Sequence, residues 1–125
     1  MTKLSETIQS ADWKKEKHAP VIDCQDTVKA GEVFEVKVGV GDEIAHPNTL
    51  EHHISWITLY FQPEGSKFPY QVGHFEFSGH GAGDTFTNPS ASVSLKVEKP
   101  GTLQAVSFCN IHGLWENTKE ISLDK

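Results

Sequence analysis

The residues of this chain best suited to chemistry are its histidines and one of its cysteines. Seven histidines and two cysteines occur in 125 residues. Cys109 lies three positions before His112, a spacing that lets a thiolate and an imidazole bind one ion from a single turn. The other histidine clusters are Glu16-Lys17-His18, His46-Pro47-Asn48 and Glu51-His52-His53. Together these clusters predict a metal site with several imidazoles and one thiolate.

Some of these side chains have a simpler interpretation. His74 lies inside a strand pattern and His80 in a glycine-rich turn, so we expect both to be structural or solvated. His52 and His53 are adjacent and would face opposite sides of a strand, so at most one points into a given site. Cys24 has no nearby histidine or cysteine, which favours a small apolar residue.

The type of metal follows from the ligand set. A structural zinc site usually uses several thiolates, and only Cys109 is available here. A blue-copper site also combines histidines with one cysteine, but it normally adds a methionine after the last histidine. The only methionine is Met1, and residues 113–125 contain neither Met nor Gln. Iron therefore fits better, and a cupredoxin-like copper electron carrier remains the alternative. A third hypothesis is an immunoglobulin-like binding module with incidental histidines.

The elements that must position these clusters are β-strands. Phe34, Val36, Val38 and Val40 alternate with polar residues or glycine, the period of a half-buried strand. Turn residues separate the predicted strands, which cover residues 20–23, 34–40, 54–61, 70–78, 91–98, 102–108 and 116–123. The pattern predicts an all-β, immunoglobulin-like antiparallel β-sandwich of about seven strands with an irregular N-terminal segment. Loops gather at the ends of such a sandwich, so the clusters can converge there.

Length and charge narrow the classes of protein further. We expect one domain over residues 1–125. The net charge of −6 argues against nucleic-acid binding, although Lys14, Lys15 and Lys17 form a local basic cluster. No apolar run approaches the roughly 18–20 residues of a membrane helix. Residues 1–13 contain no signal-like apolar core, so we expect a cytoplasmic protein without a membrane partner.

Three segments together resemble a known family. Residues 12–22 (DWKKEKHAPVI), 46–54 (HPNTLEHHI) and 109–115 (CNIHGLW) are similar to the three motifs of the superoxide reductases of the neelaredoxin and desulfoferrodoxin group. They occur in the family order and at family-like separations. The longer members carry an additional N-terminal module with four cysteine ligands, but no cysteine precedes Cys24 here.

The resemblance implies a mononuclear non-haem iron that alternates between Fe²⁺ and Fe³⁺. Its implied ligands are His18, His46 and His52 through Nε2, His112 through Nδ1, and Cys109 as the axial thiolate. Glu16 would close the sixth position in the ferric state, and Lys17 would attract the anionic substrate.

The implied reaction is the one-electron reduction of superoxide to hydrogen peroxide without release of oxygen. Ferrous iron and one thiolate carry a net charge of +1, which attracts superoxide, and the nearby lysines add to this attraction. The sequence contains no flavin or nicotinamide signature, so a rubredoxin-like protein would supply the electron. Family resemblance also implies a homo-oligomer, with a tetramer favoured.

Overall fold

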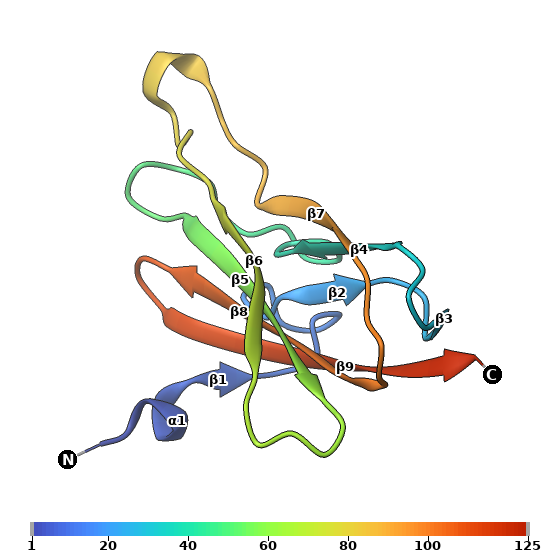
Figure 1. The fold of residues 1–125 in the computed structure, drawn as a ribbon. Coiled ribbons are helices and arrows are strands. Elements are labelled where there is room, and N and C mark those ends of the chain that lie inside the picture. Colours follow the sequence, from blue (N-terminus) through green and yellow to red (C-terminus); the bar gives the residue numbers. More distant parts are fainter. Residues whose placement is uncertain (1, 125) are drawn as a thin grey trace.

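The computed structural model describes residues 2–124, which form two β-sheets and almost no helix (Figure 1). The elements in chain order are α1 (Leu4–Thr7), β1 (Gln9–Ser10), β2 (Val21–Asp23), β3 (Thr27–Lys29), β4 (Phe34–Gly39), β5 (Ile54–Pro63), β6 (Tyr70–Glu76), the 3₁₀ turn η1 (Ala82–Asp84), β7 (Ser90–Leu95), β8 (Gly101–Cys109) and β9 (Gly113–Asp124). The predicted all-β, two-sheet architecture is confirmed.

The larger sheet has the order β1-β9-β8-β5-β6, with β3 also paired to β9, and the smaller has the order β2-β4-β7. The pairings within the smaller sheet and among β5, β6, β8 and β9 are antiparallel. The short strands β1 and β3 instead run parallel to β9. The sequence did not predict these two parallel pairs, because segments of two or three residues show no period.

The two sheets enclose one apolar core. In β4 the alternation is as predicted, since Phe34, Val36 and Val38 are buried while Glu35 and Lys37 are exposed. The core continues into Ile57 and Leu59 of β5 and Leu103 and Ala105 of β8, all fully buried. Each large side chain buried in this way stabilises the fold by roughly 1.5–3 kcal/mol.

Strand pairing brings the ligand-bearing segments to one end of the molecule. Ile54, the first residue of β5, pairs with Cys109, the last residue of β8. In the smaller sheet, Val21 at the start of β2 pairs with Gly39 at the end of β4. The segment before β2, the β4–β5 loop and the β8–β9 turn therefore meet at the same end of the two sheets, as predicted for a sandwich.

None of the helices among residues 2–124 is long and apolar enough to cross a membrane. The cytoplasmic location stays a prediction.

Candidate metal centre

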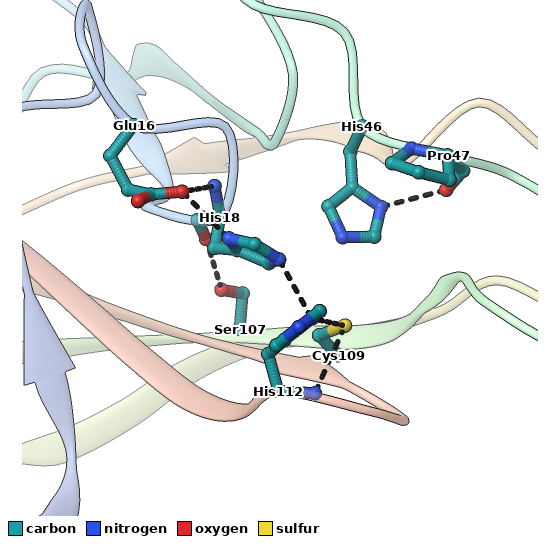
Figure 2. Close-up of polar contacts among 7 residues, drawn as sticks. All are labelled: Glu16, His18, His46, Pro47, Ser107, Cys109 and His112. Carbon is teal, nitrogen blue, oxygen red and sulfur yellow. Dashed lines mark hydrogen bonds and ion pairs between the residues drawn. The ribbon is translucent and has the colours of Figure 1, made fainter.

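Three separate parts of the chain carry the candidate ligands, and Figure 2 shows His18, His46, Cys109 and His112 among them. His18 lies just before β2, where buried Ala19 and Pro20 hold the chain against the core. Its backbone carbonyl also accepts a hydrogen bond of 3.3 Å from Ser107 Oγ of β8. His46 and His52 lie in the β4–β5 loop, residues 40–53, Cys109 is the last residue of β8, and His112 lies in the β8–β9 turn.

Four of these side chains form one cluster. His18, His46, His52 and Cys109 each offer a ligand atom, and these atoms all lie within 4.8 Å of one another. The ring centroid of His46 lies 4.9 Å from that of His18 and 4.7 Å from that of His52. Segments separated by up to 91 positions in the chain therefore present one group of donors.

His112 joins this cluster through its Nδ1 atom. That atom lies 3.0 Å from His18 Nε2 and 3.7 Å from Cys109 Sγ. The five side chains predicted as the histidine and cysteine ligands are thus brought together.

In His18 and His46, a hydrogen bond determines which ring nitrogen faces the cluster. His18 Nδ1 lies 2.6 Å from Glu16 Oε1, and His46 Nδ1 donates to the Pro47 carbonyl at 2.7 Å. A proton held on Nδ1 leaves the Nε2 lone pair free for a metal ion. Within residues 2–124, His46 Nε2 and His52 Nε2 are buried without any hydrogen-bond partner. Buried polar atoms normally have partners, so these orphaned nitrogens fit a metal ion.

The environment keeps these imidazoles in the form that binds metals. Burial lowers the pKa of His46 to about 4, and burial is also the main cause that lowers the pKa of His52. Both rings are therefore neutral near pH 7, as ligation requires. The hydrogen bond from His18 lowers the pKa of Glu16, which keeps that side chain a carboxylate.

Cys109 is held by the geometry of the β8–β9 turn. It is fully buried and pairs with Gly113 across the three-residue turn 110–112. Gly113 has a φ of +81°, a value that glycine adopts without strain. The His112 N–H donates to Cys109 Sγ at 3.4 Å, whereas the described contacts include no corresponding bond from the Ile111 N–H.

Glu16 and Lys17 lie beside the cluster. Glu16 accepts hydrogen bonds from both the ring and the backbone N–H of His18. Lys17 is half-buried, and its charge contributes to the lowered pKa values of Glu16, His46 and His52. The structure thus gives Glu16 a contact with a ligand histidine that the motif alone did not predict.

Two further residues of the C-terminal motif support the ligands and were not singled out from the sequence. Asn110 Oδ1 accepts from the His53 N–H at 2.8 Å, and Asn110 Nδ2 donates to the Glu51 carbonyl at 2.9 Å. The Trp115 ring stacks on His18, with centroids 5.1 Å apart and planes 16° from parallel. In the sequence, the only indication of a supporting role for either residue was its position between or next to candidate ligands.

Comparison with known proteins decides the family. The family model described as desulfoferrodoxin matches residues 10–118. The chain belongs to the desulfoferrodoxin family. This confirms the resemblance that the three motifs predicted.

Desulfoferrodoxin-family relatives match along nearly the whole chain. A neelaredoxin of Megalodesulfovibrio gigas is 53% identical, and the match covers 97% of this chain and 98% of that protein. A superoxide reductase of Pyrococcus furiosus is 54% identical, with 97% and 99% covered. The structure of a superoxide reductase (neelaredoxin) of Archaeoglobus fulgidus in the reduced form matches with a TM-score of 0.86 and 55% identity, covering 94% of this chain and 100% of that chain.

Proposed function

We propose that this chain is a superoxide reductase with one mononuclear non-haem iron held by His18, His46, His52, His112 and Cys109. The observation that carries the proposal is the convergence of four imidazoles and one thiolate, with buried ring nitrogens that have no other partner among residues 2–124. When bound, iron supplies one electron to superoxide, which takes up two protons and becomes hydrogen peroxide.

The donor set supports iron over copper. A blue-copper site uses two histidines and one cysteine in a trigonal arrangement with a weak axial ligand. Here His18, His46 and His52 all cluster with Cys109, and His112 adds a fourth imidazole. Two imidazoles would be left over in a trigonal copper site, whereas a five-ligand iron site uses all of them.

Lys17 is proposed to attract the substrate. A positive charge about 4 Å from an anion contributes about 1 kcal/mol in water and several times more where water is partly excluded. The chain as a whole carries a charge of −6, so a local basic segment is needed to direct an anion to the site.

Glu16 is proposed to occupy the open position in the oxidised state, in addition to orienting His18 through the 2.6 Å contact. We expect Glu16→Ala to leave reduction of superoxide largely intact and to open the oxidised site to external anions. Titration of the oxidised protein with azide, followed in the visible spectrum, measures this. Azide binding no tighter than in the wild type would contradict this role.

The reaction needs a fresh electron in each turnover, and we propose a rubredoxin-like protein as its source. We also propose a homo-oligomer, with a tetramer favoured, which light scattering measures directly.

The test of the function combines metal analysis with stopped-flow kinetics. We expect one iron per chain after growth in iron-replete medium. The reduced protein should then convert superoxide to hydrogen peroxide with no oxygen formed. Copper in place of iron would instead support the electron carrier, and release of oxygen would identify a dismutase.

A further inference from the structure

The connection from β6 to β7 extends beyond the ends of the sheets, on the side of the β4–β5 loop (Figure 1). We call residues 77–87 of this connection the glycine hairpin, because it contains Gly79, Gly81 and Gly83. The sequence indicated only a surface turn here, with His80 structural or solvated.

The glycine hairpin is tightly built. Thr87 N–H donates to the Gly79 carbonyl at 2.7 Å, and Gly79 N–H donates to Thr87 Oγ1 at 2.9 Å. A Cβ on Gly79 would lie 2.8 Å from Thr87 Oγ1, so only glycine fits between the two arms. At its base, Phe77 is buried and its N–H donates to the Ser55 carbonyl of β5 at 2.9 Å. This hairpin therefore has a defined shape and a fixed attachment to the larger sheet.

His80 joins the glycine hairpin to the β4–β5 loop. Its Nδ1 lies 2.9 Å from Asn48 Oδ1, and its Nε2 lies 2.7 Å from the Phe77 carbonyl. Asn48 Nδ2 donates to the Thr87 carbonyl at 2.9 Å, which places the amide oxygen toward His80. Both contacts of the His80 ring thus end on oxygen atoms of other residues, one in the β4–β5 loop and one at the base of the glycine hairpin.

A second contact reaches the same loop. The rings of His80 and His53 are stacked, with centroids 3.6 Å apart and planes 9° from parallel. His53 Nδ1 in turn lies 2.9 Å from the Thr49 carbonyl. The hairpin is therefore linked to the residue that follows His52 and, through Asn48, to the segment that follows His46.

The β4–β5 loop makes fewer hydrogen bonds near His46 than near His52, so contacts with the glycine hairpin matter most at its His46 end. Near His52 the loop is held by its own bonds between Thr49 and His52 and by Asn110 of the β8–β9 turn. The segment from His46 to Asn48 lacks regular secondary structure. Within the described chain, its side-chain hydrogen bonds to other segments are those of Asn48.

We propose that Asn48 and His80 are positioning residues, through which the glycine hairpin holds His46 in place for metal binding. This inference rests on the iron centre of the proposed function. A partner that orients a metal ligand typically contributes 10–100-fold to metal affinity. Asn48 and His80 are not among the clustered donor residues, so their effect on metal binding passes through the position of His46.

The experiment compares His80→Phe, which keeps a ring on His53 but loses both hydrogen bonds, with Asn48→Leu, which removes the amide at similar volume. The matched control is His74→Phe. His74 lies on β6 and contacts Thr58 and Glu76, away from both ligand loops. For each protein, release of ferrous iron to excess bipyridine is timed, and the electron paramagnetic resonance spectrum of the oxidised protein is recorded.

We expect both variants to release iron about tenfold faster than the wild type and to show a changed rhombicity of the ferric signal, while His74→Phe matches the wild type. Release rates and spectra like the wild type in both variants would overturn the proposal, even if thermal unfolding occurred at a lower temperature. An effect of Asn48→Leu without any effect of His80→Phe would overturn the role of His80. Wild-type protein that held no iron would refute the proposed function itself, which is a separate outcome.

Discussion

Each imidazole of the cluster offers two nitrogens, and in His18 and His46 a hydrogen bond decides which of them faces inward. In His18 and His46 the Nδ1 atom is engaged by the neighbouring Glu16 or Pro47, so Nε2 faces the cluster. In His112 the Nδ1 atom faces inward instead, close to His18 Nε2 and Cys109 Sγ. This difference follows from the approach of each backbone, because His112 lies in the tight turn next to the thiolate. In these three rings the nitrogen that faces the cluster is the one that the family resemblance implied, and its binding to iron stays a prediction.

Cys109→Ser tests the thiolate. We expect loss of the visible thiolate-to-iron band of the oxidised protein and loss of superoxide reduction, because a serine hydroxyl is not a comparable donor to iron. The matched control is Cys24→Ser, since Cys24 is a half-buried free cysteine outside the cluster. A visible band retained in Cys109→Ser would assign the thiolate to another residue.

Lys17→Glu tests electrostatic attraction of the substrate. We expect the second-order rate constant with superoxide to fall by about tenfold at low ionic strength and by less at high salt, because salt screens exposed charges. Lys15→Glu makes the same change of charge at an exposed neighbouring position and should have a smaller effect. An identical decrease for both variants would show that net charge, and not the position of Lys17, controls the rate.

At the scale of elements, the turns and loops position the candidate ligands, and the strands hold the ends of these turns and loops. β5 and β8 are paired along their length, and a shift of register between Ile54 and Trp56 lies beside Cys109. Such bulges often occur next to functional sites because they redirect the side chains that follow. The β8–β9 turn is then connected to the β4–β5 loop by three hydrogen bonds between Asn110 and residues 51–53.

Asn110→Ala tests this connection between the two ligand-bearing segments. Loss of its two side-chain hydrogen bonds should lower the free energy of unfolding of the metal-free protein by about 1–2 kcal/mol. Urea denaturation measures the change. Asn88→Ala is the control, because the Asn88 side chain bonds only locally to Ser90. Equal stability of both variants would show that Asn110 does not join the segments energetically.

At the scale of the whole molecule, the buried histidines of the cluster make the folded state sensitive to acid. In the metal-free protein the pKa of His46 lies at about 4, below its usual value of about 6.5 in the unfolded chain. Between these values the unfolded chain binds a proton that the folded chain does not. Acid therefore favours unfolding in this interval, and His52 acts in the same direction.

We therefore expect the stability of the metal-free protein to be fully present above pH 6.5 and to decrease as the pH falls toward about 4. Urea midpoints measured between pH 7.5 and 4.5 test this, with a chelator present. His46→Gln should reduce the dependence on pH, because it removes the histidine whose pKa is lowered most clearly. Equal wild-type midpoints at pH 7.5 and 5.5 would contradict the expectation.

Much of this protein could be predicted from the order of its residues. Alternation in residues 34–40 follows from the geometry of a half-buried strand, which is a local property. The candidate ligands at positions 18, 46, 52, 109 and 112 were predicted because their residue types and motifs are visible in the sequence alone. The short parallel strands β1 and β3 were missed, since their pairing depends on β9, which is distant in sequence.

Only the tertiary structure decided how the ligands are held. The contact of Glu16 with the His18 ring, the bonds of Asn110 and the stack of His80 on His53 join segments or orient side chains in ways that no spacing encodes. A ligand's identity is a property of one residue, whereas its position depends on neighbours that meet it only after the sheets have paired. The sequence therefore determined which groups are the candidate metal ligands, and the folded chain determined which groups keep them in place.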